Sequence, residues 1–278
     1  MSRARQSLCI LSLSVLAVLG WQWIVGRLLP RPALAESNIH ANRLRLEAWF
    51  LDPVPSNVLA GSSISGRLIP GYFAGTALAS IANLGLDGSG PLTSLDCVLM
   101  RMTNGGPAPR RVFVEIHRLD RTNDANDRML LESAHGFSMR LAGVLPAMRA
   151  ASRPSTVAYA WLKDRQPGGG TIEGRPLGDG RKVVGEPDWL NQARERVDRL
   201  QKLGVEVVLL RLPVGRENPV DSQASNFADE VAQRLGIALL DLNRRTAPAG
   251  SVLNYSDGLH LTADSARAMA RSLAQLAP

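Results

Sequence analysis

Short apolar runs alternate with amphipathic stretches along most of this chain. Five runs have the length and the β-branched or leucine-rich composition of buried strands: residues 57–60, 81–86, 111–117, 205–212 and 237–242. Helical spacing of apolar residues occurs between and after them, at residues 91–103, 127–149, 187–203, 222–235 and 262–276. This alternation predicts an α/β fold of three layers, in which a five-stranded parallel sheet carries helices on both faces.

The ends of the predicted helices carry matching signals. Gly204 and Gly236 stand where helix C-termini release the chain into the next strand, and Thr262 is a candidate N-cap for the last helix. Glycine and proline dominate residues 163–187, but the strand and helix pattern resumes afterwards, so this stretch is expected to be a surface insertion. Residues 36–278 are therefore predicted to form one domain of flavodoxin-like layout.

The pattern before this domain is different. Residues 8–26 are almost entirely apolar, follow Arg3 and Arg5, and are long enough as a helix to cross a bilayer. Residues 1–35 are therefore predicted to be an uncleaved signal anchor and a short linker, with the domain on the periplasmic or cell-envelope side. The alternative is cleavage after Ala35, which would give a secreted protein that begins at Glu36.

Composition excludes some classes of function. The net charge is +7, but the arginines are scattered and no motif for base stacking or groove reading occurs, so nucleic acid is not an expected partner. No cluster of His, Cys or carboxylate residues has the spacing of metal ligands, so no catalytic metal is expected. The basic surface is expected to face an anionic membrane or an acidic polymer.

Candidate chemistry lies near the two ends of the predicted domain. Asp257 precedes His260 by three residues at the start of the last helix, a spacing that lets the carboxylate orient the imidazole as a general base. Ser63 lies in a Gly-Ser-Ser turn after the first predicted strand and is a candidate nucleophile. Both segments follow predicted strands, and the carboxyl ends of parallel strands meet at one edge of a sheet. The sequence thus predicts a Ser-His-Asp site at this edge.

These segments resemble the SGNH (GDSL-type) hydrolase superfamily over nearly all of residues 57–278. The resemblance implies that Ser63 is the nucleophile, His260 the base and Asp257 its orienting carboxylate. Ser62 stands where the family has the aspartate of Gly-Asp-Ser. The segment Asn-Leu-Gly-Leu-Asp-Gly at residues 83–88 looks like the second family block, which implies that the N–H groups of Ser63 and Gly85 form an oxyanion hole.

The third family block normally adds an asparagine side chain as another donor. Here the third strand ends at His117, and Asn123 lies several residues further on. Three possibilities are open: His117 donates through a ring N–H, Asn123 swings back from the loop, or the activity is weak or absent.

The resemblance extends to membrane-tethered members that are associated with O-acylation of envelope polymers. It implies a serine esterase or O-acyltransferase that needs no cofactor and acts on ester-linked acyl groups of an envelope polysaccharide. Its expected partners are an acylated glycan, the membrane and a membrane-bound acyl-transfer protein. The alternative function is a catalytically weak or inactive subunit that uses the same cleft to bind a glycan.

Overall fold

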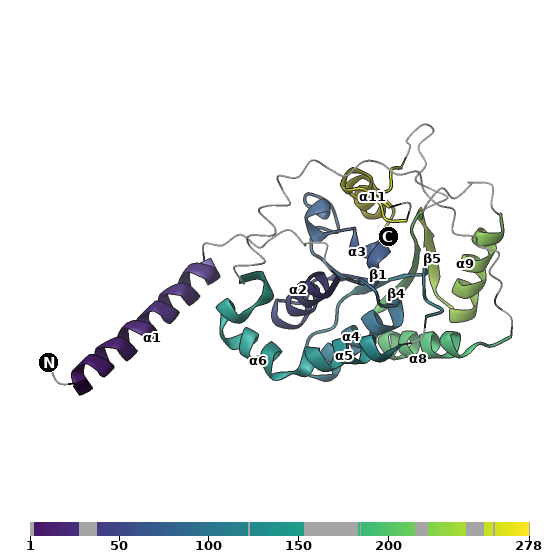
Figure 1. Ribbon diagram of the computed structural model, residues 1–278. Helices are drawn as coiled ribbons and strands as arrows, with labels where there is room; N and C mark the ends of the chain where they lie inside the picture. The colour runs from purple at the N-terminus through teal and green to yellow at the C-terminus, as the bar shows by residue number, and fades with distance from the viewer. Residues whose placement is uncertain are drawn as a thin grey trace.

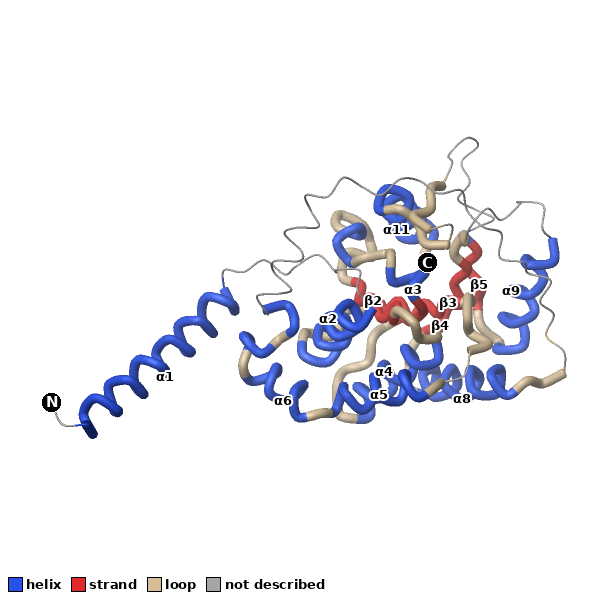
Figure 2. The backbone as a smooth tube through the Cα atoms, viewed as in Figure 1, coloured by secondary structure: helices blue, strands red, loops and turns tan. Residues whose placement is uncertain are grey.

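A computed structural model describes residues 3–27, 38–121, 123–152, 183, 185–214, 222–242, 253–257 and 259–277. Five strands in this part of the chain form one parallel sheet in the order β2-β1-β3-β4-β5. They are β1 (Asn57–Ser62), β2 (Ile81–Leu86), β3 (Arg111–Glu115), β4 (Glu206–Arg211) and β5 (Ala238–Asp241). Helices lie on both sides of the sheet (Figures 1 and 2). The predicted α/β fold with five parallel strands is confirmed.

The helices divide between the two faces of the sheet. One face is covered by α2 (Asn38–Leu51), α4 (Pro91–Thr103), α8 (Asp188–Lys202) and α9 (Ser222–Leu235), and α5 (Ala125–His135) and α6 (Phe137–Val144) pack against these helices. The other face is covered by α3 (Ser63–Gly66), the 3₁₀ turn η1 (Pro70–Phe73) and α11 (Ala263–Leu276).

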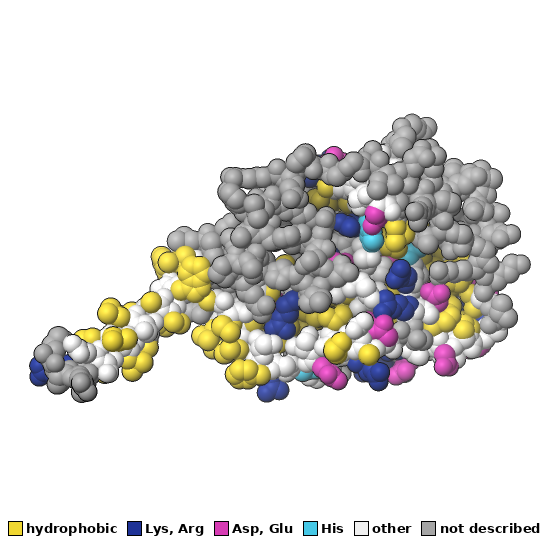
Figure 3. Space-filling model, in the orientation of Figure 1, with side chains coloured by type: hydrophobic (Ala, Val, Ile, Leu, Met, Phe, Trp, Pro, Cys, Tyr) yellow, Lys and Arg dark blue, Asp and Glu magenta, His cyan; other side chains and the backbone are white. Residues whose placement is uncertain are grey.

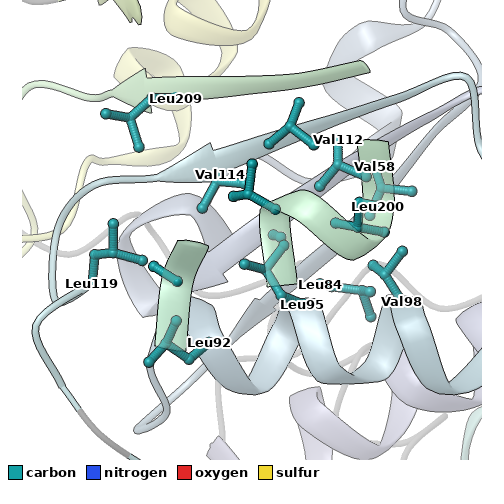
Figure 4. Packing of buried hydrophobic residues seen from close by; sticks show 14 of the residues in the cluster. Val58, Leu84, Leu92, Leu95, Val98, Val112, Val114, Leu119, Leu200 and Leu209 are labelled. Carbon is teal, nitrogen blue, oxygen red and sulfur yellow. The ribbon is translucent and has the colours of Figure 1, made fainter. Parts of the chain in front are cut away.

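Successive side chains of each strand point to opposite faces of the sheet, so the strands contribute to two separate cores, as expected when a strand is buried on both faces. In β3, Val112 and Val114 contribute to the core beneath α4 and α8, whereas Phe113 contributes to the core beneath α11. Figure 4 shows the first of these cores, where leucines of α4 meet the valines of β1 and β3. Since the strands are apolar on both faces, a charged side chain within them requires a specific partner.

The predicted helix over residues 127–149 is interrupted in the structure. Gly136 has an extended backbone that ends α5 and begins α6, and Pro146 opens the 3₁₀ turn η2 (Pro146–Met148), which η3 (Ala150–Ser152) follows. A proline inside a helix would lack the N–H and clash with the preceding turn, which explains the second break. The predicted ends at Gly204 and Gly236 are found with φ of +79° and +64°, and Thr262 caps α11 by accepting from the Ser265 N–H.

The N-terminal segment forms helix α1 (Arg3–Arg27). Large apolar side chains along it are exposed, among them Leu8, Ile10, Leu11, Leu13 and Leu16 (Figure 3). Among the described residues, no helix reaches the length and hydropathy of a membrane span. The predicted linker at residues 28–35, its cleavage site and residues 163–182 of the predicted insertion lie outside the described part of the chain.

Candidate active site

The nucleophile candidate lies where β1 passes into the short helix α3. Ser62 is the last residue of β1 and the N-cap of α3, and its Oγ accepts a hydrogen bond from the Ile64 N–H at 3.3 Å. Ser63 is the first residue of α3 and is half-buried, whereas Ser62 is buried. The turn therefore presents Ser63, and not its neighbour, at the carboxyl edge of the sheet.

The structure brings the two ends of the domain together at this edge. The His260 Nε2 lies 2.8 Å from the Ser63 Oγ, and the His260 Nδ1 lies 2.6 Å from the Asp257 Oδ2. A carboxylate only accepts, so the Nδ1 carries the proton and the Nε2 is the acceptor for the Ser63 hydroxyl. The predicted proximity of Ser63, His260 and Asp257 is confirmed, with the hydrogen-bond order of a serine-hydrolase triad.

The charge of Asp257 is stabilised by its own turn. Burial raises the pKa of this carboxyl, but hydrogen bonds from the His260 N–H, the His260 ring and the Leu259 N–H outweigh burial and lower the pKa to about 2. Asp257 is therefore ionised at neutral and mildly acidic pH. In that state it holds the Nδ1–H tautomer and can stabilise the imidazolium that forms when His260 accepts a proton.

The turn that carries Asp257 and His260 closes on itself before α11. Tyr255 and Leu261 form an antiparallel bridge, and the Ser256 N–H donates to the His260 carbonyl at 2.8 Å. These contacts fix the backbone of His260 within a few residues of sequence. The base is thus positioned by local structure at the entrance of α11.

Gly85 does not supply the predicted oxyanion donor. Its N–H donates to the Asn83 Oδ1 at 2.6 Å, and the Asn83 amide in turn donates to the Ser65 and Leu68 carbonyls. A Cβ on Gly85 would lie 2.3 Å from the Gly66 N, so glycine is required here for the close approach of β2 and α3. The prediction for Gly85 is wrong because its N–H is already satisfied within the sheet edge.

The two alternatives for the third block are also engaged elsewhere. The His117 Nε2 lies 2.7 Å from the Leu212 carbonyl oxygen. A carbonyl only accepts, so the Nε2–H of His117 is used in this bond and is not free as an oxyanion donor. The Asn123 amide donates to Asp96 at 2.9 Å, and its oxygen accepts from Thr93 at 3.0 Å, which ties Asn123 to α4.

A different backbone group is available at the same edge. The β1–β2 register pairs Ser62 with Leu86, so the loop that follows β2 runs beside the start of α3. Gly88 in this loop has φ of +77°, and its N–H has no hydrogen-bond partner within the described part of the chain. The Gly88 N–H is therefore a candidate donor for an oxyanion hole beside Ser63.

Two buried charged residues around the turn were not anticipated from the sequence. Glu115 ends β3 and accepts hydrogen bonds from the nucleophile turn, residues 61–66. Arg45 of α2 donates to the carbonyls of Gly66 and Gly85 and to Asp87. The available signal for Glu115 was a lone carboxylate inside the apolar run Arg-Val-Phe-Val-Glu-Ile.

No group of three or more His, Cys, Asp or Glu side chains among the described residues has the arrangement of a metal site. Comparisons of the chain with models of known families and with curated proteins find no match.

Proposed function

We propose that this protein is a serine esterase or O-acyltransferase of SGNH type that acts on ester-linked acyl groups. The observation that carries the proposal is the chain of contacts from the Ser63 Oγ to the His260 Nε2 at 2.8 Å and from the His260 Nδ1 to Asp257 at 2.6 Å. A serine in hydrogen-bond contact with an imidazole that is itself oriented by an ionised carboxylate is an activated nucleophile.

The contacts support a two-step reaction. The Ser63 Oγ attacks the ester carbonyl while His260 takes its proton, and the N–H groups of Ser63 and Gly88 face the developing oxyanion. The C–O bond to the alcohol breaks as His260 returns the proton to it, which leaves an acyl group on Ser63. Water or a sugar hydroxyl then gives its proton to His260 and takes the acyl group, regenerating the free serine. Water gives ester hydrolysis, and a sugar hydroxyl gives acyl transfer.

The substrate class follows from the family resemblance of the Gly-Ser-Ser and Asn-Leu-Gly-x-x-Gly segments. We place the acyl esters on a cell-envelope polysaccharide, with the domain outside the cytoplasm and α1 as its membrane anchor. The exposed apolar side chains along α1 support this placement, because lipid is a favourable environment for them. A membrane-bound acyl-transfer protein is the partner that this location implies.

A second function is favoured by a specific observation. The Gly85 N–H, the His117 Nε2–H and the Asn123 amide are all hydrogen-bonded within the protein. A site limited to backbone donors stabilises an oxyanion less well, since each lost donor costs about 10²-fold to 10³-fold in turnover. The alternative is therefore a glycan-binding or assembly subunit that retains the triad residues without appreciable turnover.

Labelling with a fluorophosphonate probe separates the two functions. An esterase or acyltransferase is expected to form a covalent adduct on Ser63, identified by peptide mass, and to release acyl groups from acetylated polysaccharide. Ser63→Ala should remove the adduct. Ser133→Ala should label like the wild type, because the Ser133 Oγ donates to the Leu130 carbonyl within α5. Absence of a Ser63 adduct in folded wild-type protein would favour the binding subunit.

A further inference from the structure

We propose that Glu115 is the positioning residue of the nucleophile turn: its carboxylate clamps the backbone on both sides of Ser63 and thereby holds the serine against His260. The inference rests on the proposed function, because it concerns the reactivity of Ser63. It also assigns a role to a residue on β3, outside the two segments that carry the triad.

The Glu115 carboxylate accepts three hydrogen bonds from the turn. The Glu115 Oε2 accepts from the N–H groups of Ser62 and Ser65, each at 2.9 Å, and the Glu115 Oε1 accepts from the Ser62 Oγ at 2.6 Å. The Ser62 Oγ accepts in turn from the Ile64 N–H, so its own proton is directed to Glu115. The N–H groups at positions 62, 64 and 65 are thus tied to Glu115 directly or through the Ser62 Oγ, while the Ser63 Oγ is left for its contact with His260.

The burial of Glu115 indicates that this arrangement is specific. Its side chain is 0% exposed and lies in a strand whose other buried residues are mostly apolar. A carboxylate in such surroundings is costly unless charge-assisted hydrogen bonds compensate for the loss of water, and the bonds to the turn are of this kind.

Gly61 makes room for the clamp. A Cβ at this position would lie 2.5 Å from the Glu115 Oε2 and 2.2 Å from the Ser65 Oγ. Only glycine lets the carboxylate reach the backbone of the turn, so the hydrogen bonds of Glu115 require glycine at position 61. Position 62 carries a neutral serine, and the negative charge that organises the turn therefore comes from β3.

Glu115 acts through the turn and not on the substrate. Its hydrogen-bond partners are positions 62 and 65, on either side of Ser63, whose Oγ must lie within hydrogen-bond reach of the His260 Nε2 to be activated. A displacement of about 1 Å in such a pair costs about 10²-fold in rate. Loss of the clamp is therefore expected to slow attack by Ser63 while leaving Asp257 and His260 paired.

A charge-swap experiment tests this role. Glu115→Gln replaces one acceptor oxygen by an NH₂ group that faces donors, and Ser62→Asp places a second carboxylate beside Glu115. Each single variant is expected to slow fluorophosphonate labelling of Ser63 by about 10²-fold. The double variant Ser62→Asp/Glu115→Gln restores one carboxylate, which can accept from the N–H groups of α3 and from the new side-chain amide at position 115. It should therefore recover most of the wild-type rate.

Two outcomes would overturn the proposal. One is Glu115→Gln labelling at the wild-type rate, and the other is a double variant that labels no faster than the slower single variant. Asp127→Asn is the matched control, because Asp127 is also 0% exposed and accepts a backbone N–H, from Asp124, but lies in α5. Its labelling rate per folded protein should equal that of the wild type.

Amide hydrogen exchange tests the clamp without any activity. Glu115→Gln should exchange faster than the wild type in residues 62–65, with β4 unchanged. Equal exchange in residues 62–65 would overturn the clamp. If wild-type Ser63 fails to label but the variant exchanges faster, the proposed function fails and the structural role of Glu115 stands.

Discussion

The two turns that meet in the site are built in opposite ways. The nucleophile turn, residues 61–66, is almost wholly buried, and its partners come from distant strands: Glu115 on β3 and Asn83 on β2. In the base turn, residues 255–257 and 259–261, local bonds hold Asp257 and His260, and the Asp257 side chain is 51% exposed. One half of the triad is thus positioned by the whole fold and the other by local sequence.

This difference predicts how the halves respond to mutation. Changes of the Asp257 and His260 side chains should alter chemistry with little effect on folding, because neither side chain belongs to the buried core. Changes in the nucleophile turn should alter both, because the same hydrogen bonds hold the sheet edge and Ser63. Measuring turnover and unfolding on the same variants tests the contrast.

The largest effect on turnover is expected for His260→Gln. Removing the general base should lower ester turnover by about 10⁴-fold or more, since Ser63 then has no proton acceptor. The melting temperature should stay within about 3 °C of the wild type, because the lost side-chain bonds are the exposed one to Asp257 and the one to Ser63. A large fall in melting temperature would show that the base turn is not the independent unit described above.

Gly61→Ala should affect both quantities. The new Cβ would collide with Glu115 and Ser65, so we expect a loss of about 3 kcal/mol in the free energy of unfolding and slower labelling of Ser63. Gly71→Ala is the control, because a Cβ there meets nothing within 4 Å and the backbone has no left-handed conformation. Denaturant unfolding and probe labelling measure the two effects, and a stable, active Gly61→Ala protein would contradict the packing argument.

The contrast also explains which parts of the site could be predicted from the sequence. Asp257 and His260 lie three residues apart, so one short sequence pattern contains both residues and predicts their contact. Ser63 was found because it follows a strand, and strand ends meet at one edge in a parallel sheet. The strands themselves are apolar runs, and the runs at 81–86 and 91–103 match β2 and α4 to the residue.

Three of the groups considered as oxyanion donors, those of Gly85, His117 and Asn123, are engaged elsewhere for a physical reason. Whether an N–H is free depends on partners that are far away in sequence, as Leu212 is from His117. Gly85 has a partner two residues away, Asn83, whose side-chain amide is oriented by its bonds to the Ser65 and Leu68 carbonyls, 15 to 18 residues away. Glu115 was missed because its three hydrogen-bond donors, on Ser62 and Ser65, belong to a turn about 50 residues earlier, and no local pattern encodes them.

A moderate effect is expected for His117→Ala. Since the His117 ring donates to the Leu212 carbonyl, the change should leave that oxygen without its partner and lower the free energy of unfolding by about 1 kcal/mol. Turnover per folded protein should stay within about threefold of the wild type, because an engaged donor adds nothing to the oxyanion hole. A fall in turnover of about 10²-fold at unchanged stability would instead return the donor role to His117.

The smallest effect concerns Asp257 and pH. The pKa of this carboxyl is lowered from its usual 3.8 to about 2 in the folded protein, so the folded state favours the charged form. Its contribution to stability is therefore present above about pH 4 and is lost as the pH falls through about 2. Because the side chain is half exposed, solvent screening keeps this contribution below about 1 kcal/mol. The free energy of unfolding of the wild type minus that of Asp257→Asn should accordingly be larger at pH 6 than at pH 2. Urea unfolding at both values measures it, and a pH-independent difference would mean that the base turn adds no charge-dependent stability.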